Sequence, residues 1–435
     1  FKGVNDTLGH AVGDALLQEV ARLLKGEVRP TDVVSTGGNQ RAGAVSRLGG
    51  DEFTVLLSKV RQARDAGDVA RRILEAVNTP VSVAGYEIST TASIGIAVFP
   101  QDGDDAETLL KRADMAMYGA KAKGPGRYEF YQPSMGQAFV RRIDLEKHLR
   151  HACERDEFEM RYQPRIDIRT GAMVGMEALI RWNSPQLGWV QPREFIPVAE
   201  ETRLIVPIGA WVIETACAQL ALWQRIGWSG LRLSVNVSSE QFVSSDLTKT
   251  VTDTLRATGL KPGALELEVT ESLMVGEDNR TALALRDLRA IGVALALDDF
   301  GTGYSSLSFL TRFPLDVLKI DRSIASGVED DPAAASIVEA VVAMGSRLGL
   351  RIVAEGVDSA GQAERIRELG CDEIQGFLIS QPLDAKELGD FRRYWRSLQD
   401  QSQTRPAGRR GILVDKASWS RAIGGITDRF RRGGH

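Results

Sequence analysis

Cysteine is scarce in this chain of 435 residues, and its cysteines do not form short pairs. The three cysteines, Cys153, Cys217 and Cys371, lie far apart and never in a C-x-x-C arrangement. This spacing argues against a disulfide framework and against a zinc site built from cysteines. The pattern is typical of a protein that functions in a reducing cytoplasm.

The sequence also lacks a long apolar run, a signal peptide and a strong excess of either charge. No stretch approaches the roughly 18 apolar residues of a membrane span, and no signal peptide opens the chain. The 54 basic and 58 acidic residues leave a net charge of −4, so we expect no direct DNA binding. Because the chain begins at Phe1, within the pattern of a strand-to-helix turn, we expect an upstream region that could tether this cytoplasmic protein to the inner membrane.

What the sequence does contain predicts folded domains. A content of 43% hydrophobic and 26% charged residues excludes a largely disordered chain, and the length suggests two or three domains. Residues 1–131 predict a mixed α+β domain. Its expected helices cover 13–24, 65–77 and 106–121, and its expected strands cover 53–57 and 89–99.

Two further segments differ from their surroundings. Residues 132–156 predict an amphipathic helix that connects and couples two domains, although a passive spacer fits the same pattern. Residues 398–435 form a basic tail, which is either a binding segment for an acidic surface or a solvated terminus.

Between residues 157 and 397 the pattern changes to short strands, most of them followed by a helical stretch. Eight strands alternating with helices are what a (β/α)8 barrel of the TIM type requires. A doubly wound open sheet remains the alternative, because periodicity does not show whether a sheet closes. The expected strands cover 158–162, 173–180, 231–237, 264–270, 293–298, 317–321, 351–355 and 373–377, and the expected helices cover 208–225, 278–290, 332–348 and 359–369.

Acidic and amide side chains stand at the ends of nearly all these strands. In a TIM-type barrel such positions meet at one face, where catalytic side chains are found. A single strand-end acid is more often a helix cap or a surface pair, but burying the whole set unpaired would be very costly. Oxygen ligands without histidine or cysteine favour Mg²⁺ or Mn²⁺ over zinc. The strand-end residues are Glu177, Asn236, Glu268, Asp298, Asp299, Lys319, Asp321, Glu355 and Gln375.

The spacing within this set indicates chemistry at phosphorus. The adjacent Asp298 and Asp299 could serve two metal ions, which would clamp the attacking and leaving oxygens of a phosphodiester. Lys319 and Asp321 are two apart in an expected strand, so we expect their side chains to share a face and to orient water. Arg181, four residues after Glu177, is a candidate phosphate ligand.

At these residues the second domain resembles the EAL-domain family of cyclic di-GMP phosphodiesterases. The matching stretches are EALIRW at 177–182, VNVS at 235–238, EVTES at 268–272, DDFGTGY at 298–304, LKID at 318–321, AEGV at 354–357 and QGF at 375–377. The resemblance implies a barrel with one antiparallel strand, two Mg²⁺ or Mn²⁺ ions, and hydrolysis of cyclic di-GMP to linear pGpG. Asp358 departs from the family, which usually has glutamate there.

The resemblance also implies a role for each motif residue. Glu177, Asn236, Glu268 and Asp298 would bind metal, and Asp299 would complete a second site. Lys319 would position or activate water, Glu355 would support the metal site, and Gln163 and Gln375 would line the substrate pocket together with Arg181 and Asp321. Glu271 would order the loop 299–304, which in this family links the active site to a homodimer interface.

The first domain resembles the GGDEF-domain diguanylate cyclases. Matching stretches are FKGVND at 1–6, GH at 9–10, GD at 13–14, GGDEF at 49–53 and ADMAMY at 113–118. The resemblance implies that Asn5 and Asp14 read guanine, and that Asp51 and Glu52 belong to the nucleotide site, with Asp51 facing Mg²⁺.

Three departures make cyclase activity from this chain unexpected. The opening strand of the family is absent, residues 124–126 lack the family's arginine, and the segment between Asp32 and Gly49 is longer than in the family, which would displace the product site at Arg29 and Asp32. We therefore expect a GTP-binding regulatory domain ahead of a phosphodiesterase. The alternatives are a catalytically inactive cyclic di-GMP receptor, or a bifunctional cyclase and phosphodiesterase in the full-length protein.

Overall fold

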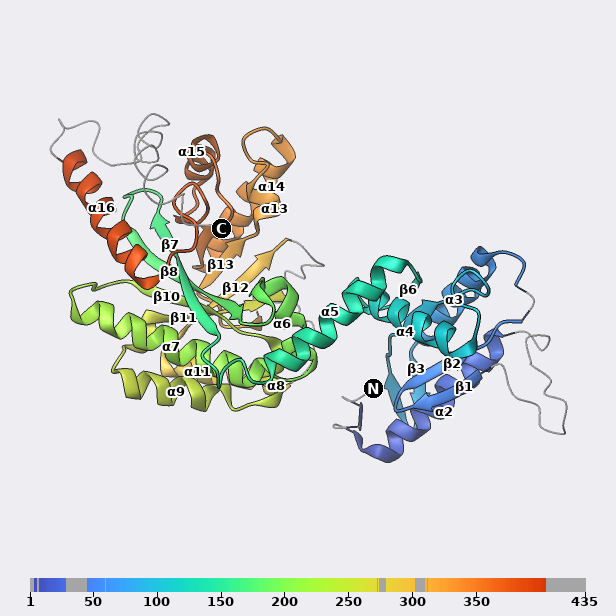
Figure 1. Cartoon of the computed structure of the whole chain (residues 1–435). Helices are drawn as coiled ribbons and strands as arrows, with labels where there is room; N and C mark the ends of the chain where they lie inside the picture. The colour runs from blue at the N-terminus through green and yellow to red at the C-terminus, as the bar shows by residue number, and fades with distance from the viewer. Residues whose placement is uncertain are drawn as a thin grey trace. The chain divides into compact units, whose positions relative to one another are not determined.

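A computed structural model describes most of the chain (Figure 1). The described residues are 4–5, 8–28, 45–58, 60–271, 273, 279–301, 310 and 312–403, without the side chains of 399–403. The predictions for Arg29, Asp32, loop residues 302–304 and the tail beyond residue 403 lie outside them. The chain divides into two compact units, residues 1–144 and 145–435.

The first unit is a mixed α+β structure with small sheets. Strands β1 and β2 pair antiparallel, as do β3 and β4, whereas β5 and β6 pair parallel. One hydrophobic cluster joins Val12 and Leu16 to Val83 and Ile88. The elements are α2 His10–Glu27, β1 Val45–Gly49, β2 Glu52–Val55, α3 Ala63–Asn78, β3 Val81–Val83, β4 Tyr86–Ile88, β5 Ser93–Ile96, α4 Ala106–Ala122 and β6 Arg127–Phe130.

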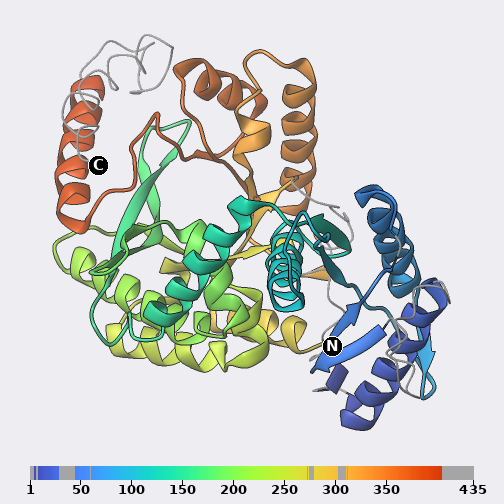
Figure 2. The same cartoon turned by 45° about the vertical axis from the view of Figure 1, so that its right-hand side comes forward.

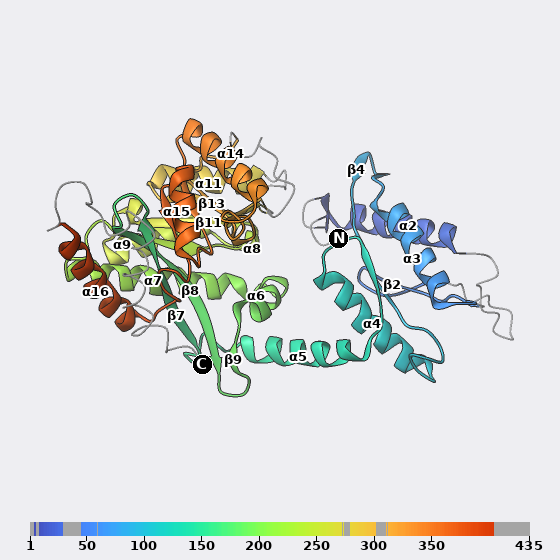
Figure 3. The same ribbon diagram turned by 90° about the horizontal axis from the view of Figure 1, so that it is seen from above.

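One continuous helix, α5 Pro133–Leu149, leads from the first unit into the second (Figure 3). Its last turn carries Leu145 and Leu149, which are buried in the core of the second unit. The chain beyond Leu149 is a series of turns, so the helix ends earlier than the sequence pattern predicts.

The second unit is a closed barrel of eight strands, because β10 and β8, the first and last barrel strands in the strand order, also pair with each other. Strand β7 runs antiparallel to β8 and β15, and the other barrel strands pair parallel. The predicted TIM-like barrel is therefore confirmed, and an open sheet is excluded. The strands are β7 Phe158–Asp167, β8 Met173–Ser184, β10 Arg232–Asn236, β11 Leu265–Thr270, β12 Ala294–Phe300, β13 Val317–Ile320, β14 Arg351–Ala354 and β15 Glu373–Ile374, with β9 Gly188–Val190 added at the edge of β8.

Helices surround the barrel strands (Figure 2). Glycines in the left-handed conformation end three of them, Gly259 after α9, Gly349 after α14 and Gly370 after α15, which is a common way to stop a helix. The helices are α6 Pro192–Glu201, α7 Ile205–Arg225, α8 Ser239–Ser244, α9 Leu247–Thr258, α11 Asn279–Ile291, α13 Arg322–Ala325, α14 Pro332–Leu348, α15 Ala360–Leu369 and α16 Ala385–Gln403.

Helix α7 corrects one sequence expectation. Within the described part of the chain, it alone has the length and apolar composition of a membrane span, although the sequence analysis found no such segment. Half of its apolar window is buried, and Ile208, Ile213 and Ala216 lie in the core of the second unit. Its apolar character is explained by packing, since α7 contacts β7 and β10.

A buried ion-pair network crosses the barrel interior below the acidic strand ends. Arg165 of β7 places Nη1 2.7 Å from Glu266 Oε1 and Nε 2.7 Å from Glu373 Oε2, and all three side chains are buried. Burial alone would raise the pKa of Glu266, but Arg165, Arg351 and the Ser234 hydroxyl together lower it to about 2. The network therefore holds charged groups inside the barrel through strong mutual pairing.

Candidate active site

Five neighbouring strands bring the predicted site residues together, most of them near the ends of their strands, whereas Glu177 lies within β8, which continues to Ser184. Glu177 comes from β8, Asn236 from β10, Glu268 from β11, Asp298 from β12 and Lys319 from β13. Asn236 pairs with Glu268, and Asp298 pairs with Thr270, two residues after Glu268, so these side chains lie on the same face of the sheet. The barrel thus gathers at one end side chains that lie more than a hundred residues apart in the sequence.

Lys319 occupies the centre of this group. Its Nζ lies 2.5 Å from Glu355 Oε1, 2.7 Å from Glu268 Oε2, 3.1 Å from Asp298 Oδ1 and 3.9 Å from Glu177 Oε2. The lysine side chain is fully buried, so the surrounding carboxylates are the partners that keep its charge inside the barrel.

The site carries more negative than positive charge, and the pKa values reflect it. Burial lowers the pKa of Lys319, but its four carboxylate neighbours outweigh that effect and raise it well above the usual value. Burial raises the pKa of Glu268 well above its usual value and that of Glu355 to about 8, with further contributions from Glu177 and Asp298. An additional cation would relieve this repulsion.

Asp299 reaches the site through an unusual backbone conformation. Its φ is +55°, in the left-handed region that side chains other than glycine rarely adopt, and the β12–β13 register shifts between Leu297 and Phe300. The Asp299 amide donates to Asp298 Oδ1 at 3.0 Å. Partial burial and the charges of Asp298 and Asp321 raise the pKa of Asp299.

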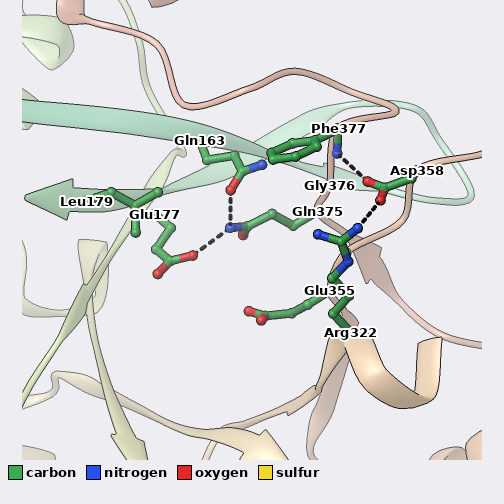
Figure 4. A pocket seen from close by; sticks show the side chains of 10 residues that line it. Gln163, Glu177, Leu179, Arg322, Glu355, Asp358, Gln375, Gly376 and Phe377 are labelled. Atoms are coloured by element: carbon green, nitrogen blue, oxygen red, sulfur yellow. Dashed lines mark hydrogen bonds and ion pairs between the residues drawn. The ribbon is translucent and has the colours of Figure 1, made fainter. Parts of the chain in front are cut away.

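A cavity of about 200 Å³ opens beside these residues (Figure 4). Gln375 donates through Nε2 to Gln163 Oε1 at 3.1 Å and to Glu177 Oε2 at 2.5 Å. Gln163 in turn donates to the carbonyl of Ser380 at 3.1 Å. The structure therefore places both predicted pocket glutamines in the cavity wall, next to the carboxylate group.

Two predicted placements differ from the structure. Strand β13 ends at Ile320, so Asp321 does not share a strand face with Lys319; instead Asp321 Oδ1 caps α13 by accepting from the Ser323 amide at 2.9 Å. The expected strand was one residue too long. Arg181 is half-buried and donates to the carbonyl of Ile180 at 2.8 Å, and it is not among the described residues that line the cavity.

Glu271 directly follows β11. The loop that it would order lies mostly outside the described residues, so the predicted contact between them stays a prediction.

In the first unit, three of the four predicted nucleotide residues lie on α2 or around the β1–β2 turn, and Asn5 precedes α2. Asp14 is exposed on α2, and Asp51 and Glu52 are exposed at the turn. Gly50 has a φ of +54°, and Arg47 Nε donates to its carbonyl at 2.9 Å, which fixes the turn. Asn5 Oδ1 is buried without a hydrogen-bond partner.

The residue types of the acidic site fit divalent cations. No group of three or more histidine, cysteine or acidic side chains is arranged to hold a metal ion within the described ranges, and carboxylates surround the Lys319 ammonium instead. Carboxylates and the Asn236 amide oxygen are nevertheless the ligands that Mg²⁺ and Mn²⁺ prefer. Glu268 Oε1 is buried without a hydrogen-bond partner, so this ligand atom is available.

The sequence reasoning missed part of the cavity wall. Leu179, Arg322 and Phe377 line the cavity, and so does Asp358, which had been singled out only as a departure from the family. Arg322 lies two residues after the end of β13, so a search that extended two residues beyond each strand end would have found it.

A closed mixed barrel with a carboxylate-rich site at the carboxyl ends of its strands defines a TIM-like barrel protein of the kind that acts through this face. Comparison with known families makes the class specific. Residues 146–382 match the EAL domain, and residues 1–127 match the diguanylate cyclase GGDEF domain. The chain belongs to the EAL-domain family and carries a GGDEF domain ahead of its barrel, as the motifs indicated.

Characterised relatives share both domains. The bifunctional diguanylate cyclase/cyclic di-GMP phosphodiesterase MucR of Pseudomonas aeruginosa is 42% identical over 388 residues, which cover 89% of this chain and 55% of MucR. The cyclic di-GMP phosphodiesterase PdeR of Escherichia coli is 37% identical over 385 residues, which cover 88% of this chain and 56% of PdeR. The chain thus spans about half the length of these relatives.

Solved structures resemble the barrel. The PaMucR phosphodiesterase in complex with c-di-GMP is 44% identical, with a TM-score of 0.54, and the match covers 56% of this chain and 99% of that structure. The EAL enzyme Bd1971 in its cAMP- and cyclic-di-GMP-bound form is 30% identical, with a TM-score of 0.57, and the match covers 67% of this chain and 77% of that structure.

Proposed function

We propose that the second unit hydrolyses one phosphodiester bond of cyclic di-GMP and releases linear pGpG. The observation that carries this proposal is the convergence of Glu177, Glu268, Asp298 and Glu355 around Lys319 at the carboxyl ends of the barrel strands. The phosphodiesterase names of MucR and PdeR support the choice of substrate.

Two divalent cations, Mg²⁺ or Mn²⁺, are part of the proposal. Glu177, Asn236, Glu268 and Asp298 would hold the first, and Asp299 would complete the site of the second. When bound, such ions lower the pKa of water and neutralise charge on the phosphoryl oxygens. Burial and the charge of Asp298 raise the pKa of the Asp299 carboxyl, which supports a cation-binding role for this pair.

The chain's own side chains would position the reactants. Lys319 is buried and carries three N–H donors, so its ammonium would orient the attacking water. Gln163 and Gln375 already form a hydrogen-bonded pair in the cavity wall and would bind the dinucleotide. Glu355 would hold Lys319 in place, since its Oε1 lies 2.5 Å from Nζ.

A direct assay tests the proposal. The chain is incubated with cyclic di-GMP and Mn²⁺, and the nucleotides are separated by chromatography; we expect pGpG. Excess EDTA should stop turnover, and added Mn²⁺ should restore it. If micromolar protein releases no pGpG, the phosphodiesterase proposal is wrong; tight binding that EDTA leaves unchanged would then identify a receptor.

The first unit would act as a regulatory GTP-binding domain, and the second unit would form a homodimer. Asn5 Oδ1 has no hydrogen-bond partner among the described residues, which supports a role for this acceptor toward a guanine donor. A regulatory coupling of about 1–3 kcal/mol would change hydrolysis roughly 5- to 150-fold when GTP binds. An unchanged rate with demonstrated GTP binding would contradict this role, and sedimentation of the chain would test the dimer.

A further inference from the structure

Arg322 lies in the cavity wall beside the proposed catalytic groups. It is the first residue of α13 and lines the cavity together with Glu177, Glu355 and Gln375. Figure 4 shows Glu177 on one side of the cavity and Arg322, Asp358 and Phe377 grouped on the other. The Arg322 side chain is 59% exposed, so a ligand in the cavity can reach its guanidinium.

Asp358 forms an ion pair with the Arg322 guanidinium. Its Oδ2 lies 2.8 Å from Arg322 Nη2, while its Oδ1 accepts from the Phe377 amide at 3.1 Å. The Asp358 backbone amide donates to Gln362 Oε1 at 2.8 Å, which anchors the backbone at this position to the first turn of α15. The guanidinium also lies over the Phe377 ring, 5.9 Å from its centroid. Asp358 thus pairs with one guanidinium nitrogen of Arg322 and sets the orientation of the guanidinium.

Gly356 makes room for the aliphatic part of Arg322. A Cβ at position 356 would lie 2.2–2.7 Å from the Cβ, Cγ and Cδ atoms of Arg322, closer than atoms can approach. Gly356 also has a φ of +62°, which disfavours other residues. The loop after β14 is therefore shaped to the arginine side chain, which distinguishes this contact from an ordinary surface ion pair.

The charges of the residues that line the cavity indicate that Arg322 has a role in binding an anion. The described residues that line the cavity include the acids Glu177, Glu355 and Asp358, and Arg322 is the one cationic residue among them. Lys319 is enclosed by carboxylates, so its charge is already compensated. Among the described side chains that line the cavity, Arg322 is therefore the cation available to pair with a phosphodiester oxygen beside the proposed metal ions.

We propose that Arg322 binds a phosphate oxygen of the dinucleotide and that Asp358 is a positioning residue for its guanidinium. The inference rests on the proposed phosphodiesterase function and adds a substrate contact to it. Arginine suits this role because its planar guanidinium can pair with Asp358 through one nitrogen and present the others to the ligand.

The test compares Arg322→Gln, Arg322→Lys and Asp358→Asn with wild type in the cyclic di-GMP assay with Mn²⁺. Arg322→Gln keeps most of the side-chain stem against Gly356 and removes the charge. We expect it to raise KM at least about 10-fold while kcat changes much less, because a charge-assisted hydrogen bond is lost. Arg322→Lys should recover part of the loss, and Asp358→Asn should raise KM by a smaller factor.

The salt dependence of KM and a matched control variant show whether Arg322→Gln weakens substrate binding or only the fold. The KM difference between wild type and Arg322→Gln should shrink as salt is raised, since screening weakens a phosphate contact. Arg256→Ala serves as the control, because Arg256 is an exposed arginine on α9 that pairs with Asp253. Arg256→Ala should keep the wild-type KM.

The outcomes keep the two proposals distinct. If wild type releases pGpG and Arg322→Gln keeps its KM, with only a lower melting temperature, Arg322 has a structural role and the inference is overturned. If wild type releases no pGpG, the proposed function fails, and calorimetry with cyclic di-GMP then decides about Arg322. Weaker binding by the variant supports the contact, and equal binding overturns it.

Discussion

The Lys319 ammonium lies 2.7 Å from Glu268 Oε2, and both side chains are almost completely buried. They come from β11 and β13, the two neighbours of β12 in the barrel. Removing two charges from water is costly unless each finds a partner, and breaking such a pair costs more than forming it gains. Replacing either Lys319 or Glu268 should therefore change both the catalytic activity and the stability of the second unit.

Replacing Lys319 by methionine should reduce kcat at least about 100-fold, because the group that orients water is lost. In metal-free buffer the variant should also unfold more easily than wild type, because four carboxylates lose their shared cation. Pre-steady-state release of pGpG and denaturant unfolding measure the two effects. Lys249→Met on α9, where the lysine is exposed beside Asp253, is the control and should change neither quantity.

Replacing Glu177 by alanine should abolish turnover and weaken Mn²⁺ binding. Glu177 accepts hydrogen bonds from Asn236 at 2.6 Å and from Gln375 at 2.5 Å, so its loss also frees a proposed metal ligand and a pocket residue. Calorimetric titration with Mn²⁺ and the pGpG assay measure the result. Glu368→Ala, at an exposed ion pair on α15, should behave as wild type; a wild-type rate for Glu177→Ala would refute the metal assignment.

The sequence was sufficient to predict the barrel and the residues that its strand ends bring together. The order of the strands determines the barrel and also the site, since the last residues of all parallel strands lie at the same face of the barrel. Lys319, Glu268 and Asp298 could be grouped in this way without knowledge of the loops. Asp321 was misplaced because β13 ends one residue earlier than its apolar pattern suggests.

Features that depend on loop conformation could not be predicted. The contact of Arg322 with Asp358 joins α13 to the loop after β14, and no periodicity relates these segments. The left-handed conformation of Asp299 could not be predicted from the sequence either, because an aspartate at a strand end does not by itself indicate a positive φ. Hydropathy alone also does not show that α7 is a core helix of a barrel, since burial and membrane insertion select the same residues.

The left-handed backbone of Asp299 allows charge and conformation to be tested separately. Asp299→Asn should reduce kcat at least about 100-fold, because a proposed metal ligand is lost, while stability in metal-free buffer is maintained, because asparagine tolerates a φ of +55°. Asp299→Ala should lose the same activity and also about 1 kcal/mol of stability, because alanine disfavours this conformation. Equal stability of the two variants, measured by denaturant unfolding, would contradict the argument from backbone conformation.

Glu266 should make the second unit less stable in acid. Its pKa in the folded state is about 2, below the ordinary 4.5, so its ionised form stabilises the fold above about pH 4.5, and this contribution disappears as the pH falls through about 2. Glu266→Gln should therefore lower the free energy of unfolding at pH 7 by on the order of 3 kcal/mol, and the difference from wild type should shrink steadily between pH 5 and about pH 2. Tryptophan fluorescence during denaturant unfolding measures this, since all seven tryptophans lie within residues 145–435. The control is Glu387→Gln, at a half-exposed ion pair with Arg161. A difference for Glu266→Gln that stays constant across this pH range would mean that Arg165 and Arg351 do not stabilise the ionised carboxylate.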